Sequence, residues 1–238
     1  FGQGWGAGPV APNLMNDWNA AESGDMRREA SVQNVKDLPA YTYGGWADFV
    51  QETDYYGKKQ GPVTAKYTDD SGTTQYAPVF EYVMYGENGW QNDNLMQTGN
   101  IHDLVLRFAD VLLMQSELKE DVSGINRVRA RAGLAPIGAY SLTALQNERR
   151  WELAFEGVRW NDIRRWHIAA AALEKQTNQP VYYLGSSAKN TPHSGGYAAR
   201  YNATAGFFKI PETEVSLSNG ALVQNEGWTD ASSEYSGW

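Results

Sequence analysis

The chain has 238 residues, 42% of them hydrophobic, so it is long enough to bury a sizeable core. Its formal net charge of -8 repels phosphate backbones, which argues against nucleic acid as a partner. The absence of cysteine excludes disulfides, thiol nucleophiles and thiolate metal sites. The 9 Trp and 14 Tyr suggest that some rings do more than fill the core.

The start of the chain carries no recognisable targeting segment. It begins at Phe1 without a Met and without a basic-then-apolar signal sequence. No apolar run approaches the roughly 20 residues of a membrane helix. We therefore expect a fragment or a processed form whose targeting information lies upstream.

Residues 1–100 are rich in glycine, aromatic and polar residues and show little periodicity. A short helix is predicted at 13–21 and a strand-like run at 79–85. Turns are predicted at 70–72 and 87–89, where glycine follows polar residues. The region is therefore expected to be loop-rich.

Residues 101–175 have helical periodicity and predict antiparallel helix hairpins. The first helix is expected from a cap at Asp103 to about residue 117. Its apolar side chains are expected to form one broad buried face, and they are Leu104, Phe108, Val111, Leu112 and Met114.

Three more helices are predicted before residue 176. The second begins at Asp121 or Ser123 and stops at Gly133, with one apolar side made of Ile125, Val128 and Ala132. The third begins at Ser141 or Thr143, where Thr143 and Gln146 fit a capping box, and ends at Gly157. The fourth covers 160–175 and carries His167 on one face. Residues 176–238 return to loop character.

The densest charge cluster surrounds three glutamates spaced four apart, Glu148, Glu152 and Glu156. Like charges at that spacing repel one another on a helix, so the face needs cations, which nearby arginines can supply. The arginines are Arg127, Arg129, Arg131, Arg149 and Arg159. The cluster predicts a structural ion-pair network, in which we place Arg149, Glu152, Glu156, Arg159 and Asp162.

Glu152 and Glu156 also suggest a glycoside hydrolase, in which one carboxyl acts as acid and the other as nucleophile or base. Arginines around a carboxylate lower its pKa, which is wrong for a general acid. We therefore expect no catalytic residues and no enzymatic activity.

Metal and cofactor motifs are missing from the sequence. The histidines are far apart, and they are His102, His167 and His193. A phosphate loop and a dinucleotide fingerprint are also missing. No metal and no cofactor are predicted. A calcium site built from loops stays possible but is not predicted.

The aromatic loops of 41–56 and 82–93 are the strongest binding signal. Flat rings stack on the C–H faces of sugars, while short amides and carboxylates pair with hydroxyls, and the same groups suit peptides. Alternatively, these rings fill the core or anchor loops. The predicted ligand contacts are Tyr43, Trp46, Asp48, Tyr55, Tyr56, Trp90, Asn92 and Asp93.

Five ordered motifs together resemble the SusD/RagB family. They are LRFADVLLM at 106–114, INRVRARAGL at 125–134, ERRWELAFEGVRWNDIRRW at 148–166, KIP with Glu214 at 209–214, and QNEGW at 224–228. The resemblance implies a mainly α fold of tetratricopeptide-like helix pairs with a loop-rich irregular region and few short strands. Residues 1–238 would be the C-terminal part of one such domain, with 1–100 facing ligand, 101–175 as scaffold and 176–238 as closure.

The resemblance also implies a function. The protein would capture oligosaccharides at the outer membrane, on the extracellular face of a Gram-negative cell, and deliver them to a SusC-like TonB-dependent transporter. It would be a lipoprotein whose lipid anchor lies upstream of this chain. A RagB-type protein for oligopeptides and a helical-repeat adaptor are the alternatives. Family members are about twice this length, so the predicted site is partial.

Overall fold

The computed structural model describes residues 9–38, 41–44, 51–59, 64–78, 104–190 and 196–228. The fold is mainly α, as predicted, with short strands beside the helices. The helices are α1 (Pro12–Ala21), α2 (Met26–Ser31), the 3-10 turn η1 (Val35–Asp37), α4 (Phe108–Lys119), α5 (Ser123–Arg131), α6 (Leu142–Glu152), α7 (Arg159–Arg165), α8 (Ala169–Glu174), α9 (Gly196–Thr204) and α10 (Glu212–Leu217). The strands are β1 (Val32–Asn34), β2 (Gln51–Glu52), β3 (Tyr55–Gly57), β4 (Thr64–Thr68), β5 (Thr74–Pro78), β6 (Pro180–Tyr183) and β7 (Ser186–Lys189).

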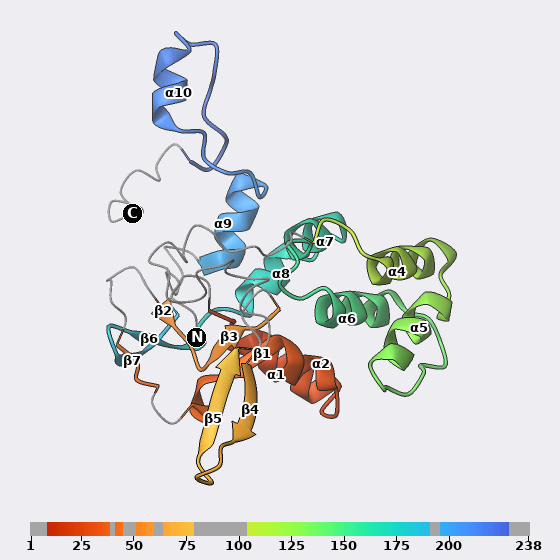
Figure 1. The fold of residues 1–238 in the computed structure, drawn as a ribbon. Helices are drawn as coiled ribbons and strands as arrows, with labels where there is room; N and C mark the ends of the chain where they lie inside the picture. Colours follow the sequence, from red (N-terminus) through yellow and green to blue (C-terminus); the bar gives the residue numbers. More distant parts are fainter. Residues whose placement is uncertain are drawn as a thin grey trace.

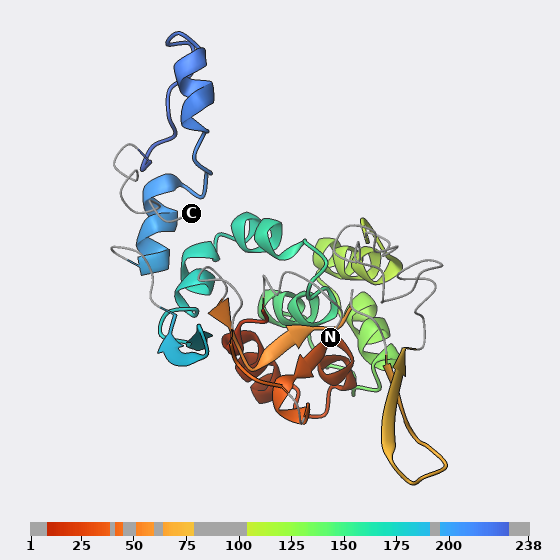
Figure 2. The ribbon, with the colours of Figure 1, turned by 60° about the vertical axis from the view of Figure 1, so that its left-hand side comes forward.

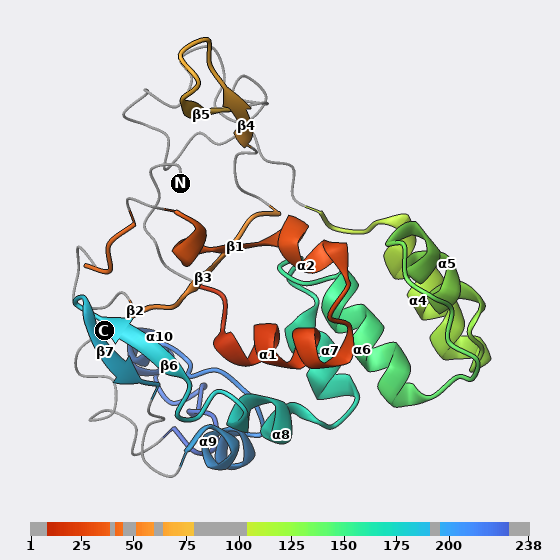
Figure 3. The same ribbon diagram turned by 90° about the horizontal axis from the view of Figure 1, so that it is seen from below.

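Helix α6 lies at the centre of the molecule. It contacts α4 and α5 on one side and α2 on the other. Figure 1 shows α4 to α8 on one side and the strands on the other, with α9 and α10 leading away from this body. The β4–β5 hairpin also projects outward (Figure 2). Seen from below, α1 and α2 lie beside α6 and α7 (Figure 3).

The strands form three small antiparallel sheets, in the orders β1-β3, β2-β6-β7 and β4-β5. The predicted turn at 70–72 is confirmed at the tip of β4–β5, where Gly72 has a φ of 80°. Strands β6 and β7 are joined by Leu184 and Gly185, whose φ values of 47° and 77° are those of a type I′ hairpin turn.

The core has two parts. One lies between α4, α5 and α6 and contains Leu112, Leu113, Ile125, Val128, Leu145 and Leu153. The other joins α1 to α6 through Trp18 and Trp151, whose rings stack with centroids 5.3 Å apart. The predicted apolar side of the second helix is confirmed, because Ile125, Val128 and Ala132 are buried. Gly133 has a φ of 71° and follows that helix, as predicted.

Gly124 allows α5 to begin against α4. A Cβ at this position would lie 1.9 Å from the carbonyl oxygen of Leu112. The Ser116 hydroxyl accepts hydrogen bonds from the N–H groups of Gly124 and Ile125 at 2.9 and 3.1 Å, which satisfies two donors of the first turn of α5. The close packing of α4 against α5 therefore requires glycine at position 124, because glycine has no side chain.

The prediction for the first helix is partly wrong. The helix begins at Phe108, because Arg107 is extended and its side chain is held by Glu152 and Glu156. The expected broad buried face is not formed: in the predicted set only Leu112 is buried. The exposed members of that set are Leu104, Phe108, Val111 and Met114. The predicted cap Asp103 lies outside the described residues.

The third helix begins at Ser141, whose hydroxyl accepts a hydrogen bond from the N–H of Ala144 at 3.1 Å. Ser141 is therefore the cap, rather than Thr143. The helix ends at Glu152 rather than at Gly157. Phe155 and Gly157 have φ values of 67° and 77°, so the chain turns before the predicted stop.

The predicted fourth helix is two helices, α7 and α8. His167 has a φ of 57° and lies between them, not on a helix face. The N–H of His167 donates to Arg164 and that of Ile168 donates to Ile163, which is the pairing of a Schellman motif. This motif closes α7 before α8 begins.

Beyond residue 175, the predicted loop character is wrong for β6, β7, α9 and α10. The strand-like run at 79–85, the turn at 87–89 and the tail from 229 lie outside the described residues. None of the described helices is long and apolar enough to cross a membrane.

We predict that Gly124→Ala lowers the free energy of unfolding by about 3 kcal/mol or more, because its Cβ must displace the backbone of α4. The matched control is Gly138→Ala, where nothing lies within 4 Å. Urea unfolding of both variants measures the difference. Equal effects of the two substitutions would contradict the close approach of α4 and α5.

Candidate functional site

Four tyrosines from distant parts of the chain form one group, the tyrosine cluster: Tyr41, Tyr43, Tyr56 and Tyr182. The rings of Tyr43 and Tyr182 stack with centroids 3.7 Å apart and planes 18° apart. Tyr41 meets the Tyr43 ring edge-on at 5.2 Å and lies 6.3 Å from the Tyr56 ring. All four side chains are half-buried, so part of the ring surface faces solvent.

The strands bring these rings together. Tyr56 lies in β3, opposite Gln33 of β1. Tyr182 lies in β6, opposite Glu52 of β2. The turn after β6 approaches residues 43 and 44 so closely that a Cβ on Gly185 would lie 2.8 Å from the Tyr43 carbonyl oxygen. Gly185 therefore lets this segment lie against the β6–β7 hairpin.

Two carboxylates hold the ring hydroxyls. The Tyr41 hydroxyl donates to Glu52 at 2.7 Å, and the other oxygen of Glu52 accepts from the Gly44 N–H at 3.0 Å. The Tyr43 hydroxyl donates to Asp54 at 2.5 Å, and Lys36 donates to the other oxygen of Asp54 at 2.8 Å. Each ring is thus fixed at both its face and its hydroxyl.

The electrostatics keep these hydroxyls protonated. Burial, and then hydrogen bonding to Tyr56 and Glu52, raise the pKa of Tyr41 above its usual range. Burial and the bond to Asp54 do the same for the pKa of Tyr43. Partial burial alone would raise the pKa of Asp54, but hydrogen bonds from Lys36 and Tyr43 lower it. The cluster therefore presents the neutral hydroxyls of Tyr41 and Tyr43 beside the ionised carboxylate of Asp54.

The structure brings two of the predicted contacts, Tyr43 and Tyr56, into the cluster. Tyr55 precedes Tyr56 in β3, so its side chain points to the opposite face of the strand. The other predicted contacts, Trp46, Asp48, Trp90, Asn92 and Asp93, lie outside the described residues. The sequence interpretation missed Tyr182, although the β-branched and aromatic run at 181–183 followed by a glycine turn is a hairpin signal.

Half-exposed rings with fixed hydroxyls suit a ligand that has both apolar C–H faces and hydroxyl groups. Rings already held by their neighbours lose little freedom on binding, which favours affinity. Tyr41, Tyr43 and Tyr56 are not activated nucleophiles, because their raised pKa values keep these hydroxyls protonated. The arrangement is therefore suited to stacking and hydrogen bonding.

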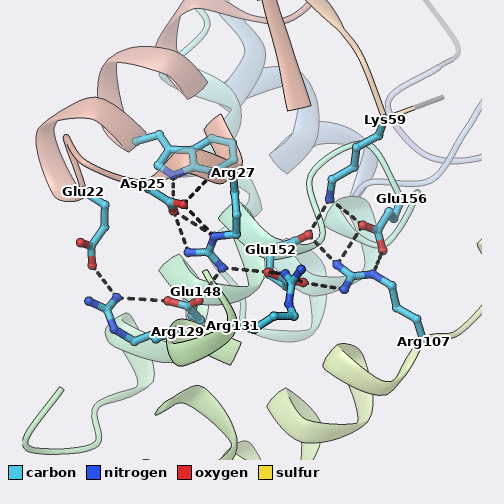
Figure 4. A network of polar contacts seen from close by, with 11 residues as sticks. Glu22, Asp25, Arg27, Lys59, Arg107, Arg129, Arg131, Glu148, Glu152 and Glu156 are labelled. Carbon is cyan, nitrogen blue, oxygen red and sulfur yellow. Dashed lines mark hydrogen bonds and ion pairs between the residues drawn. The ribbon is translucent and has the colours of Figure 1, made fainter. Parts of the chain in front are cut away.

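The glutamate cluster forms a separate buried network (Figure 4). Glu152 lies at its centre with a side chain that is 1% exposed. One oxygen accepts from Arg107 at 2.5 Å and from Arg131 at 2.6 Å. The other accepts from Arg27 at 2.8 Å and from Arg131 at 2.7 Å. One carboxylate is thus shared by three arginines from three parts of the chain.

The two neighbouring glutamates extend this network. Glu148 accepts from Arg27 at 2.7 Å and from Arg129 at 3.3 Å. Glu156 accepts from Lys59 at 2.6 Å and from Arg107 Nε at 2.6 Å. The network continues through Arg27 to Asp25, whose carboxylate also accepts from the indole of Trp18 at 2.9 Å.

The partners that the sequence interpretation missed are Arg27, Arg107 and Lys59. Each lies at least 45 residues from its glutamate, so no local spacing indicates the pairing. Arg127, which was expected to join the network, lies over the Phe108 ring instead, with its guanidinium carbon 5.2 Å from the centroid.

A second network joins α4, α6 and α7. Arg149 donates to Asp162 at 2.9 Å and to Asp110 at 2.6 Å. Arg165 donates to the other oxygen of Asp162 at 2.9 Å. Four of the five residues predicted to be structural therefore lie in ion-pair networks, as that role requires: Arg149, Glu152, Glu156 and Asp162. Arg159 does not, because no carboxylate among the described residues pairs with it.

The geometry argues against a glycosidase built on Glu152 and Glu156. Their side chains are 1% and 5% exposed, so a sugar cannot reach them. Burial alone would raise the pKa of Glu152, but hydrogen bonds from Arg27 and Arg107 lower it. A general acid needs a raised pKa. Within the described ranges, His, Asp and Glu form no group of three that could hold a metal ion.

Comparisons with known proteins agree with the motifs. Residues 3–228 match the family model described as SusD family. SusD-like protein P2 of Formosa agariphila is 27% identical over 185 residues, which cover 69% of this chain and 32% of that protein.

A solved structure gives the same fold. A SusD homologue from Bacteroides thetaiotaomicron aligns with a TM-score of 0.51 and 23% identity, over 92% of this chain and 44% of that chain. A laminarin-binding SusD-like protein aligns with a TM-score of 0.46 and 25% identity, over 91% of this chain and 37% of that chain. This chain therefore spans less than half the length of these relatives.

We predict that Glu152→Gln lowers the free energy of unfolding by about 3–5 kcal/mol, because it leaves three arginines without their shared buried anion. The control is Glu212→Gln, whose side chain is 64% exposed and should change stability by less than about 0.5 kcal/mol. Denaturant unfolding measures both. A Glu152→Gln protein as stable as the control would show that the network contributes nothing.

The free energy of unfolding is also expected to depend on pH through Glu152. Its folded pKa is lowered from the ordinary 4.5, so its contribution is complete above that pH and is lost as pH falls through the folded pKa. The stability difference between the native protein and Glu152→Gln should therefore shrink below about pH 4.5. Urea unfolding between pH 7 and pH 3 tests this. A difference that grows on acidification would reverse the sign and contradict the assignment.

Proposed function

Because the chain belongs to the SusD family, we propose that it captures an oligosaccharide at the cell surface and catalyses nothing. The observation that supports this most is the tyrosine cluster, in which half-exposed rings lie beside carboxylates that fix their hydroxyls. Rings supply stacking surface for sugar C–H faces, and the neutral hydroxyls and backbone amides supply hydrogen bonds.

The proposed site extends beyond the cluster. Tyr43 and Tyr56 are proposed stacking contacts, joined here by Tyr182. Trp46 and Trp90 remain proposed stacking contacts, with Asp48, Asn92 and Asp93 as polar contacts. Residues 1–100 would face the ligand, 101–175 would act as scaffold and 176–238 would close the domain. No cofactor is proposed.

The proposed partner is a SusC-like TonB-dependent transporter in the outer membrane of a Gram-negative cell. The protein would sit on its extracellular face as a lipoprotein, held by a lipid anchor upstream of this chain, and would pass the captured oligosaccharide to it. The family assignment supports this partner and place.

We predict that Tyr182→Ala weakens oligosaccharide binding about tenfold or more, a loss of about 1.4 kcal/mol, because it removes the ring stacked on Tyr43. The matched control is Tyr183→Ala, the next residue of β6, whose side chain points to the opposite face of the strand and is 40% exposed. Isothermal titration of the full-length protein against a panel of oligosaccharides, with a peptide mixture alongside, makes the measurement.

The outcomes separate the candidate functions. Heat from one glycan class that is lost in Tyr182→Ala but kept in Tyr183→Ala supports the proposal. Heat from peptides alone would make this a RagB-type protein. Equal loss in the two variants would move the ligand away from the tyrosine cluster, and Trp46→Ala and Trp90→Ala then test the remaining contacts.

A further inference from the structure

A cavity of about 220 Å³ lies between α1, α6, α7 and α8. It shares no residue with the tyrosine cluster. Its wall is largely apolar and includes Leu14, Leu153, Ala154, Phe155 and Ile163. The volume is far above the roughly 10–15 Å³ that one water needs. The cavity therefore has room for a small organic group.

Arg159 lines this cavity without a counterion. Its guanidinium makes no hydrogen bond or ion pair within the described part of the chain, whereas its two neighbours are paired. Arg149 binds Asp110 and Asp162, and Arg150 binds Asp17 at 2.6 Å. Burial and the nearby charge of Arg150 lower the pKa of Arg159 to about 10, so it stays charged at neutral pH. The charges of Asp162 and Asp17 raise its pKa from a distance, but no carboxylate among the described residues is hydrogen-bonded to it.

A second polar group in the same wall also lacks a partner. The Oδ1 atom of Asn13 is buried and makes no hydrogen bond. Dry cavities in proteins are lined by apolar groups alone, whereas cavities with unsatisfied polar groups hold polar occupants. The Oδ1 atom of Asn13 accepts hydrogen bonds and a carboxylate donates none, so Asn13 indicates a donor such as water in the cavity, while Arg159 is the group that can bind an anion.

The charge balance limits the occupant to one negative charge. The oxygens of Asp162, which lines the cavity, are taken by Arg149 and Arg165. Asp17 is taken by Arg150 and Lys175. With Asp110 and Glu117, these carboxylates make four anions against five cations, Arg149, Arg150, Arg159, Arg165 and Lys175, so one positive charge is in excess among the described residues. A planar carboxylate fits the fork of a guanidinium in two hydrogen bonds. A doubly charged phosphate would instead meet two nearby carboxylates.

We infer that this cavity binds a carboxylate on a small apolar body, with the carboxylate on Arg159 and the apolar body against Leu14, Leu153 and Phe155. The same chemistry has two sources. One is a free carboxylic acid, and the other is an Asp or Glu side chain from a part of the protein outside these residues. Either source supplies the anion that Arg159 lacks.

The experiment uses the full-length protein and sodium hexanoate, with 1-hexanol as the neutral probe of the same length. Thermal unfolding and isothermal titration are measured for the native protein, Arg159→Gln, Arg159→Lys and the control Arg127→Gln. Arg127 is exposed and lies on α5, away from the cavity.

A free acid as occupant predicts that hexanoate raises the unfolding midpoint of the native protein and of Arg127→Gln. Its affinity for Arg159→Gln should be at least tenfold weaker, and 1-hexanol should have no effect. A side chain of the same protein as occupant predicts no response to hexanoate. In that case Arg159→Gln should unfold at a lower temperature than Arg127→Gln, and Arg159→Lys should restore the midpoint by restoring the charge.

Three results overturn the inference. The first is an equal rise of the unfolding midpoint with hexanoate and with 1-hexanol, which would show that the cavity does not recognise the carboxylate. The second is an equal response of the native protein and Arg159→Gln to hexanoate. The third is no response to hexanoate together with an Arg159→Gln protein that is as stable as Arg127→Gln or is not rescued by Arg159→Lys.

Discussion

The fold depends on one buried carboxylate, Glu152, and on the three arginines that share it. Arg27 comes from α2, Arg107 from the start of α4 and Arg131 from the end of α5, while Glu152 ends α6. A buried carboxylate is costly unless it is paired, and the same holds for the guanidinium of Arg27, whose side chain is 10% exposed. The low-energy arrangement therefore requires all four elements to meet at one point.

The same network positions the strands that carry the tyrosine cluster. Lys59 follows β3 by two residues and donates to both the Glu152 carbonyl and the Glu156 carboxylate at 2.6 Å. Ser31 at the end of α2 accepts from the Lys58 N–H at 2.7 Å. Strand β3, with Tyr56, is thus tied to the helical body at its end. The ion pairs of the glutamate cluster therefore help to position the tyrosine rings relative to the helices.

Local signals in the sequence predicted local structure well. Ser141 starts α6 and Gly133 follows α5, because caps act within a few residues. The break between α7 and α8 was not predicted, since a histidine rather than a glycine takes the left-handed position at residue 167. The buried face of α4 was overestimated, because periodicity shows which side chains share a face but not what covers them.

The candidate site was predicted only where its residues lie close together in the sequence. Composition pointed to Tyr43 and Tyr56, but Tyr182 is more than a hundred residues away and joins them only through the pairing of β2 with β6. The partners of the glutamates were missed for the same reason, because Arg27 and Glu152 are 125 residues apart. Long-range pairing is a property of the fold and leaves no local pattern.

The two polar clusters differ in their exposure to solvent. The carboxylates of the three glutamates are buried and paired with cations, so a ligand cannot reach them. The tyrosines are half-exposed and can reach a ligand, and the raised pKa values of Tyr41 and Tyr43 keep these two hydroxyls neutral. The three glutamates are thus confined to the interior. The accessible face of the tyrosine cluster offers rings and hydroxyls, which suit stacking and hydrogen bonding.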